Sequence, residues 1–502
     1  MLLFIFVRYK KTIAKMNLPS HIAPLAKDIK QVIQTHISYV LISDDEVLKF
    51  KKPVNFGFLD FENLADRKKY CKAEVKLNSR YSEGIYKGVV AVNVEGNRVE
   101  DLDSEKVVDY AVQMNAFEQE DVLVYIIKRD GEIEKDLLRE LASNVAYAHL
   151  NNAPTSTYIQ SFGTSGKINE GFNNNLGLAS TFIGKTISQK QFDILHTYFN
   201  KFIEKNKGLL DDRSEKGFVK ECHGDLHLAN ICIYQNRVQP FDCIEFNEEF
   251  RFIDTFYDIA FLLMDLDYRK AKDGSNVVLN QYLEITNDFE GIRLLNFYKS
   301  MRAVIRGSVT SLELNDQNIS DKQKEKAIAT AKEFYDLALS YLEPQTGKLY
   351  CTTGVSGSGK SYLARQLAQV NDAVIVRADA VRKHLCKVSL DEKSTSIYTD
   401  EISLQTYAKM KDLAKMMLSS GFDVILDATF SKKEYREMLK DLIPKYLECT
   451  APKDVLVERL NNRVDIADAD VTVMENQLLN YEGVTGATFV DTTKNIDLKK
   501  LL

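Results

Sequence analysis

The chain has 502 residues, of which 45% are hydrophobic and 27% charged. This length exceeds what one compact core usually holds, so two or three domains are expected. The formal net charge of −6 comes from 66 basic and 72 acidic residues. Without long runs of either sign, it argues against a protein that mainly binds nucleic-acid backbone or anionic membranes. The seven cysteines are scattered, with no C-x-x-C pair, so we expect a reducing, cytoplasmic environment.

The first 15 residues hold a short apolar run followed by four basic residues. A membrane span needs about 20 apolar residues, and a signal peptide carries its charges before the apolar run. Because Met16 comes next, we expect residues 1–16 to be an unstructured extension or the product of an upstream start. A short membrane-touching anchor and a packed strand are the alternatives. No membrane association of the whole protein is expected.

The elements predicted for the first two thirds of the chain form a small mixed sheet followed by helices. The sheet should contain a β-hairpin over 37–52, strands at 89–92 and 107–114, and a helix over 61–77. Beyond residue 118 we expect helices over 133–149, 191–205, 256–266 and 321–342, with short strands at 231–233 and 240–241. Proline and glycine in 343–347 mark a boundary.

The pattern after this boundary is different. Strands expected at 348–353, 373–376 and 423–426 alternate with helices, as in a parallel α/β unit. The predicted fold class is therefore mixed, α+β before the boundary and α/β after it. We expect an extension over 1–16 and two domains, over 17–345 and 346–502.

A phosphate-binding motif opens the second domain. The run from Gly354 to Ser361 satisfies G-x-x-x-x-G-K-S and lies between a predicted strand and a predicted helix. Backbone N–H groups in such a loop curl around phosphate oxygens, the lysine reaches the β and γ phosphates, and the serine can bind Mg²⁺. The candidate nucleotide residues are Gly354, Gly357, Ser358, Gly359, Lys360 and Ser361, with Ser361 also a metal ligand. A serine-rich surface loop is the alternative.

Two further groups of residues follow the later strands. Asp379 at a strand end could accept a proton from an attacking hydroxyl, with Arg382 binding the substrate. The alternative is a helix N-cap with a solvated arginine. Asp427 ends the next strand and could order Mg²⁺ or bind acceptor hydroxyls, unless it is a simple cap.

Arg459 and Arg463 are four residues apart on a predicted helix. They could reach the transferred phosphate if that helix is a mobile lid. Ordinary surface arginines are the alternative.

Together, the glycine loop, D-x-x-R, the strand VILDAT and R-x-x-x-R resemble the AAA_33-type P-loop kinases, over about 155 residues. This group is similar to polynucleotide 5′-hydroxyl kinases, gluconate-kinase-like enzymes and zeta-toxin kinases. The resemblance implies Lys360 and Ser361 as nucleotide residues, Asp379 as the base, and Arg459 and Arg463 as lid residues. The segment 466–469 reads Ile-Ala-Asp-Ala, where the family often has Ser-Asp-Ala.

A second chemical site is predicted in the first domain. The run H-G-D-L-H-L-A-N places Asp225 five residues before Asn230, and Asp242 follows on the next strand. An ATP phosphotransferase needs this set: Asp225 to orient or deprotonate a hydroxyl, and Asn230 and Asp242 to hold Mg²⁺. His223 should bond backbone in the loop.

Zinc bound by cysteines and histidines is an alternative interpretation of the same run. The residues concerned are Cys222, His223, His227, Cys232 and Cys243. Their spacing matches no zinc rule fully, and the cysteines look like small buried residues. A turn without catalytic function is a further alternative.

A kinase-type site also needs a strand lysine paired with a helix glutamate. Lys49 lies on the second strand of the predicted hairpin, and Glu74 lies in the following helix. Lys51, on the same face of the strand, is the alternative to Lys49. Residues 114–117 are expected to be the hinge whose backbone contacts adenine.

The motifs H-G-D-L-H-x-x-N, F-D-x-I-E-F and R-F-I-D-x-x-x-D-I-A-F-L resemble the aminoglycoside phosphotransferase family, which has the protein-kinase-like fold. Residues 35–40 and 51–61 further resemble the subgroup fused to a C-terminal P-loop kinase, over roughly residues 17–500. The resemblance implies ATP and Mg²⁺, with Asp225 as base and Asn230 and Asp242 as metal ligands. It does not imply aminoglycosides, because the fold serves many hydroxyl substrates.

We therefore expect an ATP-dependent phosphotransferase with two nucleotide sites, using a small-molecule hydroxyl acceptor in the first domain. There are two alternatives. One domain could be a non-catalytic ATP-binding regulator, or the second domain could be a nucleic-acid 5′-hydroxyl kinase. No obligate protein partner is expected. Residues 346–502 hold 22 basic and 22 acidic residues, so the net −6 belongs to the first part of the chain. This acidic bias suits a cationic or neutral acceptor, and solvated surface explains it equally well.

Overall fold

The computed structural model describes residues 9–10, 18–26, 29–316, 319–463 and 465–502. The chain forms two compact units. The N-terminal unit comprises residues 1–269 and 294–342, and the C-terminal unit comprises 270–293 and 343–502. Most of the predicted extension over 1–16 lies outside the described residues. None of the helices in the described part of the chain combines the length and apolar character needed to cross a membrane.

A seven-stranded sheet opens the N-terminal unit, in the order β1-β2-β3-β4-β7-β5-β6. The strands are β1 (Tyr9–Lys10), β2 (Gln31–Gln34), β3 (Ser38–Ile42), β4 (Glu46–Lys51), β5 (Tyr86–Val92), β6 (Arg98–Val99) and β7 (Asp109–Asn115). The predicted hairpin is confirmed as β3 and β4, with Ser38 opposite Lys51. Every pairing in this sheet is antiparallel, where a mixed sheet was expected.

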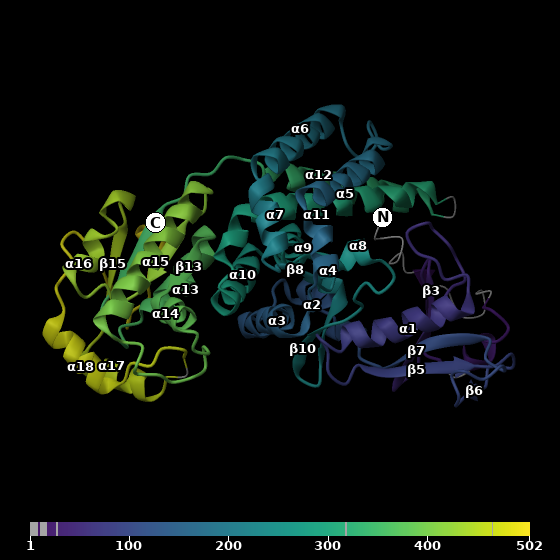
Figure 1. Cartoon of the computed structure of the whole chain (residues 1–502), viewed down its shortest axis with the longest axis horizontal. Coiled ribbons are helices and arrows are strands. Elements are labelled where there is room, and N and C mark those ends of the chain that lie inside the picture. The colour runs from purple at the N-terminus through teal and green to yellow at the C-terminus, as the bar shows by residue number, and fades with distance from the viewer. Residues whose placement is uncertain (1–8, 11–17, 27–28, 317–318, 464) are drawn as a thin grey trace. The chain divides into compact units, whose positions relative to one another are not determined.

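Helix α1 (Leu64–Asn78) packs across β5 and β7 and encloses a core around Cys71, Val112 and Met114. Figure 1 shows α1 running along these strands. The predicted helix over 61–77 is therefore confirmed, starting three residues later. Glu74 is on the buried side of α1, facing the sheet that carries Lys49, so the helix brings an acid to the strand lysine.

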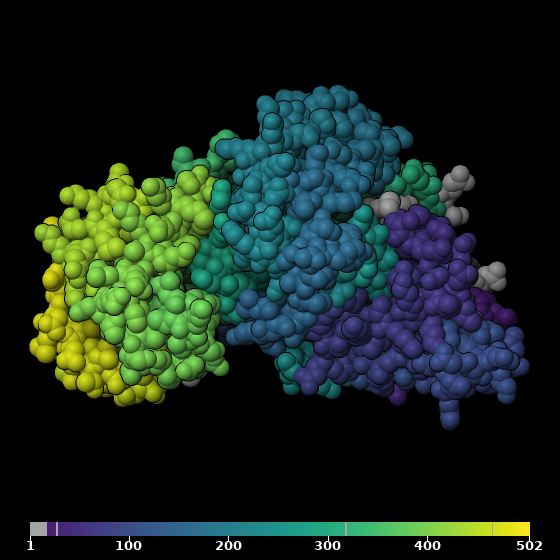
Figure 2. Space-filling model, viewed as in Figure 1, coloured from purple at the N-terminus to yellow at the C-terminus, as the bar shows by residue number. Residues whose placement is uncertain are grey.

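The rest of the N-terminal unit is mainly helical. Its helices are α2 (Leu123–Asp130), α3 (Lys135–Tyr147), α4 (Thr157–Gln160), α5 (Ser165–Ser180), α6 (Gln189–Lys205), α7 (Lys207–Glu215), α8 (Glu248–Arg251), α9 (Thr255–Tyr268), α11 (Ile292–Leu312) and α12 (Asp321–Ser340). Two short antiparallel pairs lie among them: β8 (Val219–Glu221) with β11 (Phe252–Asp254), and β9 (Ile231–Tyr234) with β10 (Arg237–Pro240). Nearly every residue of α9 is buried, so this helix forms the centre of the lobe. In Figure 2 the purple and blue atoms, from the N-terminal part of the described chain, gather in one continuous body.

The C-terminal unit is built on a parallel sheet in the order β13-β14-β12-β15-β16. Its strands are β12 (Leu349–Thr353), β13 (Val374–Arg377), β14 (Val424–Asp427), β15 (Lys445–Thr450) and β16 (Thr488–Asp491). Its helices are α10 (Lys272–Thr286), α13 (Lys360–Asn371), α14 (Ala378–Cys386), α15 (Asp400–Ser419), α16 (Lys433–Glu437), α17 (Lys453–Asn461) and α18 (Val471–Asn480). The expected fold class, a sheet lobe with a helical lobe followed by a parallel α/β unit, is confirmed.

Helix α10 lies far before the predicted boundary in sequence, yet it belongs to the C-terminal unit. The side-chain oxygen of Asn280 accepts a hydrogen bond of 2.7 Å from the backbone N–H of Ile375. Asn276 and Asn280 both donate to the carbonyl of Ala373. These bonds satisfy backbone groups of β13, which is an edge strand with one side unpaired. The asparagine side chains of α10 thus make hydrogen bonds that a neighbouring strand would otherwise make.

Candidate active sites

The predicted catalytic loop, residues 223–230, connects β8 to β9 and is held from behind by α9. The carboxylate of Asp258 accepts hydrogen bonds from the backbone N–H groups of His223 (3.1 Å) and Gly224 (2.9 Å). Gly224 has φ of +84°, and a Cβ there would lie 2.7 Å from the carbonyl oxygen of Phe250, so only glycine fits. His223 contacts the carbonyl of Phe241 at 3.0 Å, as expected of a loop residue that bonds backbone.

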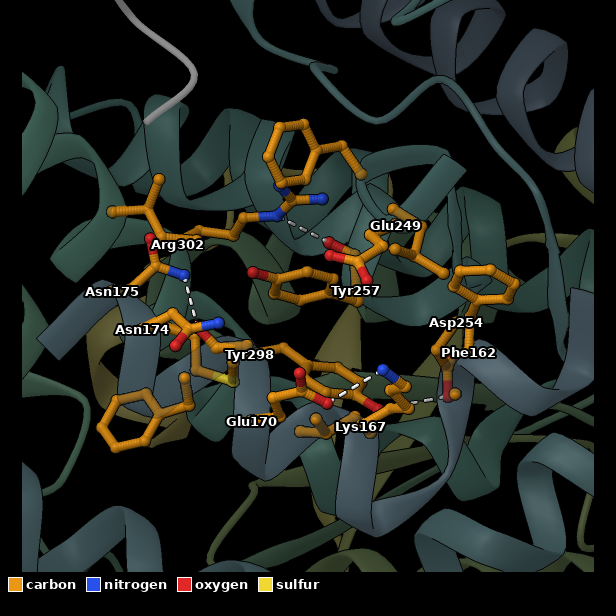
Figure 3. Close-up of a pocket in the computed structure, with 18 residues that line it drawn as sticks. Phe162, Lys167, Glu170, Asn174, Asn175, Glu249, Asp254, Tyr257, Tyr298 and Arg302 are labelled. Carbon is orange, nitrogen blue, oxygen red and sulfur yellow. Dashed lines mark hydrogen bonds and ion pairs between the residues drawn. The ribbon is translucent and has the colours of Figure 1, made fainter. Parts of the chain in front are cut away.

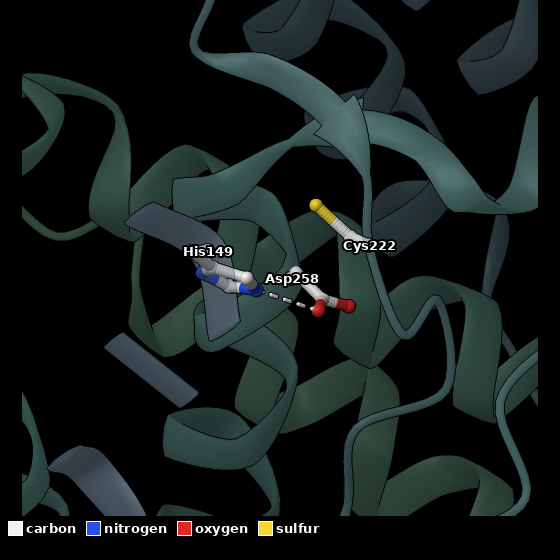
Figure 4. A group of neighbouring side chains, drawn as sticks. All are labelled: His149, Cys222 and Asp258. Atoms are coloured by element: carbon white, nitrogen blue, oxygen red, sulfur yellow. Dashed lines mark hydrogen bonds and ion pairs between the residues drawn. The ribbon is translucent and has the colours of Figure 1, made fainter. Parts of the chain in front are cut away.

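Among the described residues, His149, Cys222 and Asp258 form the group whose side-chain ligand atoms lie close enough together to hold a metal ion (Figure 4). The zinc alternative involving His223, His227, Cys232 and Cys243 therefore does not assemble among them. Asp258 already accepts three hydrogen bonds, including one from His149 at 3.1 Å. Burial raises the pKa of Cys222 well above its usual value, which keeps the thiol protonated and a poor ligand. This cluster supports the loop.

Asp225 and Asn230 converge at the front of the loop. The side-chain amide of Asn230 donates to the Asp225 carboxylate and to the Asp225 carbonyl, both at 3.0 Å. His227 Nε2 lies 3.3 Å from the same carboxylate. Burial would raise the pKa of Asp225, but the nearby His227 and Arg306 outweigh it, and the pKa is lowered. Asp225 is therefore ionised at neutral pH, as a base must be.

Asp242 reaches this loop through the β9–β10 hairpin. The N–H of Phe241 donates to the carbonyl of Asn230 at 2.9 Å, which places the two predicted metal ligands on adjacent segments. Asp242 has φ of +67°, a left-handed conformation that is uncommon for residues other than glycine. Its backbone N–H donates to the hydroxyl of Tyr86 at 3.0 Å.

The strand lysine and the helix glutamate meet as predicted. Lys49 Nζ donates to Glu74 at 2.8 Å and to Asp242 at 2.5 Å. Burial alone would lower the pKa of Lys49, but the carboxylates of Asp242 and Glu74 outweigh it and hold the pKa well above its usual value. Lys51 contacts Glu74 as well, at 2.8 Å. Only Lys49 of the two is within reach of Asp242 among the described contacts.

A cavity of about 320 Å³ lies beside this ion pair. Lys49, Glu74 and Asp242 line it, and so do Met114, Ala116 and Phe117. The predicted hinge and the predicted phosphate lysine thus face one space. Strand β2 and the turn from Thr35 to Ser38 also line the cavity, although β2 was not predicted, because four residues of mixed polarity give no clear period.

The donor set at this loop fits Mg²⁺. Within the described chain, the side-chain oxygen of Asn230 is buried and has no hydrogen-bond partner. Leaving such an oxygen unpaired costs free energy unless another group binds it. A carboxylate and an amide oxygen are the hard ligands that Mg²⁺ prefers, and both are offered by Asn230 and Asp242.

In the C-terminal unit the glycine loop follows β12 and begins α13 at Lys360, as predicted. Gly354 has φ of +126° and Gly359 +89°, and a Cβ at Gly359 would lie 2.8 Å from Thr492 Oγ1. Lys360 Nζ donates to the Val355 carbonyl at 2.9 Å, folding back across the loop. Burial lowers the pKa of Lys360, and Asp427 offsets this only in part. Ser358 Oγ is buried and has no partner among the described residues.

Asp427 ends β14 next to this loop and accepts a hydrogen bond from Thr352 Oγ1 at 3.0 Å. Arg377, at the end of β13, lies 3.5 Å from its other oxygen. Arg377 also donates twice to Asp465 at 2.9 Å and once to Glu284 of α10 at 3.0 Å. Arg377 was not predicted, because a strand-end arginine gives no motif; its three acidic partners are separated widely in sequence.

Asp379 lies at the start of α14, partly exposed beside Arg382 and Tyr398. Arg382 Nη1 and the Tyr398 hydroxyl donate to the same Asp379 oxygen at 3.4 and 3.2 Å. The predicted pair is thus in contact. Asp468, in the segment that departs from the family pattern, lies 3.3 Å from the same Tyr398 hydroxyl, as an alternative acceptor for its proton, and accepts from the buried Lys383 at 3.3 Å. This segment and the candidate base therefore share Tyr398 as a neighbour.

The two arginines that were predicted to form a lid donate hydrogen bonds to nearby groups of the C-terminal unit. Arg459 donates to the Gly357 carbonyl at 3.3 Å and to Thr492 Oγ1 at 2.8 Å, which ties α17 to the glycine loop. Arg463 donates to the carbonyls of Ala467 and Ala469 at 3.0 and 2.7 Å. None of the described contacts of the two guanidinium groups involves Lys360. Their role in phosphate binding stays a prediction.

Comparison with known proteins follows this division of the chain. Residues 349–484 match the AAA_33 family, described as an AAA domain. An uncharacterized protein of Mycobacterium tuberculosis is 27% identical over 441 residues, which cover 86% of this chain and 85% of that protein. A gluconokinase from Sinorhizobium meliloti has 21% identity and a TM-score of 0.24, covering 31% of this chain and 88% of its own. An ADP-bound aminoglycoside phosphotransferase has 16% identity and a TM-score of 0.32, covering 62% and 97%.

The resemblance of the C-terminal unit to AAA_33 proteins is thereby confirmed. The lysine–glutamate pair, the Asp225 loop and the glycine loop are the parts that phosphoryl transfer from ATP requires. The residues that the structure brings together at the two sites are therefore of the kind that ATP-dependent phosphotransfer uses.

Proposed function

We propose that the chain carries two nucleotide sites and that the N-terminal site transfers the γ-phosphoryl group of ATP to a hydroxyl of a small molecule. The observation that carries the proposal is the convergence of three separate segments: Lys49 contacts Asp242 beside a 320 Å³ cavity, and the segment of Asp242 is bonded to the loop in which Asn230 holds Asp225. A structural turn would not need an acid–lysine contact, an unpartnered amide oxygen and an adjacent cavity together.

Each residue then has a definite task. Lys49, held by Glu74, binds phosphate oxygens of the nucleotide, whose adenine contacts the backbone of residues 114–117. Asn230 and Asp242 hold Mg²⁺, which when bound neutralises charge on the phosphates. Asp225 orients the acceptor hydroxyl and takes up its proton as the oxygen attacks the γ phosphorus, and ADP leaves. Little more is required, because positioning and charge neutralisation supply most of the catalysis.

A second cavity, of about 140 Å³, lies in the helical lobe and is the place we propose for the acceptor. Figure 3 shows Tyr257, Tyr298 and Arg302 around it, with Glu249 near its edge. Arg302 donates to the carbonyl of Gly224 at 3.2 Å, so its wall touches the residue before Asp225. Aromatic walls with acids at the rim suit a neutral or cationic molecule with an apolar part.

We propose that the C-terminal unit is a second phosphotransferase site, with Lys360 and Ser361 binding nucleotide and Mg²⁺ and Asp379 as the base. The contact of Asp379 with Arg382 and Tyr398 supports an acceptor at this strand end. Asp427, near the loop lysine, supports a metal there.

The experiment uses the full chain with radiolabelled ATP, Mg²⁺ and a panel of hydroxyl compounds that includes amino alcohols, sugars and oligonucleotides with free 5′ ends. Transfer is compared in the wild type, Asp225→Ala and Lys360→Ala. We expect transfer to at least one small molecule that Asp225→Ala abolishes and Lys360→Ala retains. Transfer that Asp225→Ala leaves unchanged would refute the N-terminal assignment, and transfer only to oligonucleotides would replace the small-molecule acceptor.

A further inference from the structure

Lys51 and Glu245, which the mechanism above does not use, belong to a buried ring of charges. The ammonium of Lys51 donates to Glu74 at 2.8 Å and to Glu245. Because Lys49 binds the other oxygen of Glu74, that single carboxylate bridges two lysines of β4. The side chains are almost sealed from solvent, with exposed fractions of 1% for Lys51, 0% for Glu74 and 4% for Glu245.

The ring joins three segments of the fold. Lys49 and Lys51 lie two residues apart on β4 and so face the same side of the strand. Asp242 and Glu245 lie three residues apart after β10, and Glu74 comes from α1. Two cross-links therefore run from β4 to the segment after β10: Lys49 to Asp242, and Lys51 to Glu245.

The two cross-links differ in their surroundings. Lys49 and Asp242 line the nucleotide cavity, whereas Lys51 and Glu245 are not among the described residues that line it. Lys51 instead lies 5.0 Å from the centre of the Phe61 ring, and Phe61 packs edge-on against Phe246. The ion pair between Lys49 and Asp242 must open when Lys49 binds a phosphate of the nucleotide. The ion pair between Lys51 and Glu245 lies outside the cavity and can stay closed.

We propose that Lys51 and Glu245 are positioning residues that keep Glu74 and the Asp242 segment in register with β4 while Lys49 binds nucleotide. The inference rests on the proposed function of the N-terminal site. A buried ion pair is often no more stabilising than an apolar pair of equal volume, so a ring of five charges is poorly explained by stability alone. Their arrangement is explained by the need to hold a lysine and a metal ligand at fixed separation.

The test measures nucleotide binding rather than turnover. All variants are made in a Lys360→Ala background, which silences the C-terminal site, and binding of the non-hydrolysable analogue AMP-PNP is measured by calorimetry with Mg²⁺ and with EDTA. Lys51→Met should weaken binding with Mg²⁺ by about tenfold or more, the effect typical of losing a group that orients a metal ligand. Binding in EDTA should change far less, because Lys49 remains.

Lys299→Met is the matched control. Lys299 is also a nearly buried lysine, paired with Asp267, and its ammonium lies 4.6 Å from the centre of the Tyr341 aromatic ring. It belongs to α11 and is not a member of the ring of charges around Lys51. It should lower thermal stability without changing the Mg²⁺ dependence. If Lys51→Met and Lys299→Met leave Mg²⁺-dependent binding equally unchanged, the positioning role is refuted.

The double variant Lys51→Met/Glu245→Leu covers the case in which the single change prevents folding. Replacing both charges by apolar groups removes the orphaned carboxylate, so the chain should fold. It should still show the weakened Mg²⁺-dependent binding, and wild-type binding in this variant would overturn the proposal. Failure of the proposed function gives different results. In one case the parent variant Lys360→Ala binds no AMP-PNP. In the other, no acceptor is phosphorylated although Lys51→Met still weakens Mg²⁺-dependent binding.

Discussion

The side-chain amide of Asn230 donates a 3.0 Å hydrogen bond to the carboxylate of Asp225. Because the amide nitrogen is used in this way, its oxygen is the atom left to bind a cation, and it has no partner among the described residues. One side chain thus fixes the candidate base and offers a metal ligand. A substitution at Asn230 is therefore expected to affect both the base and metal binding, whereas a substitution at Asp225 leaves the amide oxygen in place.

The change Asp225→Asn should abolish transfer at the N-terminal site while nucleotide still binds. Loss of a general base typically costs a factor of about 10² to 10⁴ in rate. Asp225 is not among the described residues that line the nucleotide cavity, so AMP-PNP affinity should stay within about threefold of wild type, the scale of a lost peripheral contact. Steady-state kinetics with calorimetry check both parts, and a matching loss of affinity would contradict the assignment.

The change Asp258→Asn should disorder the catalytic loop. The Asp258 carboxylate accepts from two backbone N–H groups and from His149, and burial opposed by His149 leaves its pKa lowered. An asparagine must turn an N–H₂ group toward these donors. We expect a loss of about 3 kcal/mol in unfolding free energy, with hydrogen exchange faster at residues 223–225. Asp273→Asn, an acid in the first turn of α10, serves as control.

The pKa of Asp258 also gives a pH dependence. Its pKa is lowered in the folded state, so the stabilisation is present above the unfolded pKa of about 4 and is lost as pH falls through the lower folded value. Chemical denaturation of wild type between pH 7 and pH 3 should show a steeper acid loss of stability than in Asp258→Asn. Parallel curves would mean that Asp258 is not ionised in the folded chain.

The two nucleotide sites should lose AMP-PNP binding at different alkaline pH values. Burial lowers the pKa of Lys360, whereas the pKa of Lys49 is held well above normal by Asp242 and Glu74 despite burial. As pH rises, Lys360 loses its positive charge below the usual lysine pKa of about 10.4, and Lys49 loses it above that value. AMP-PNP binding to the C-terminal site, measured in Asp242→Asn, should therefore weaken at lower pH than binding to the N-terminal site, measured in Lys360→Ala. The reverse order would contradict these environments.

The change Gly359→Ala should destabilise the C-terminal unit and remove its nucleotide site. Alanine is disfavoured at φ of +89°, and its Cβ would lie 2.8 Å from Thr492 Oγ1. We expect a cost of about 1–3 kcal/mol and no AMP-PNP binding at this site. Gly166→Ala, where a Cβ meets nothing within 4 Å, is the control that should bind normally.

Local patterns were sufficient to predict several parts of the molecule. Alternation of apolar residues predicted β3 and β4, and the strand–glycine–helix order predicted the loop at Lys360. The pairs Lys49–Glu74 and Asp225–Asn230 were predicted because chemistry fixes their residue types and their order along the chain. In each case the signal lies within a short segment or in a motif whose spacing has a physical cause.

Other parts depend on contacts between distant segments. Arg377 meets Asp465 and Glu284, which are 88 and 93 residues away, and no local signal links them. Helix α10 joins the C-terminal unit through Asn276 and Asn280, although its sequence precedes the predicted boundary. Lys49 was preferred from the sequence with Lys51 as the alternative, and the contact that distinguishes them, Lys49 with Asp242, joins residues 193 positions apart.

The central claim is that one chain holds two independent nucleotide sites, and calorimetric stoichiometry tests it most directly. Titration of the full chain with AMP-PNP and Mg²⁺ should give two nucleotides per chain in the wild type. Lys360→Ala and Asp242→Asn should each reduce this to one, and the combined variant to none. A wild-type stoichiometry of one, abolished by either substitution alone, would contradict the account.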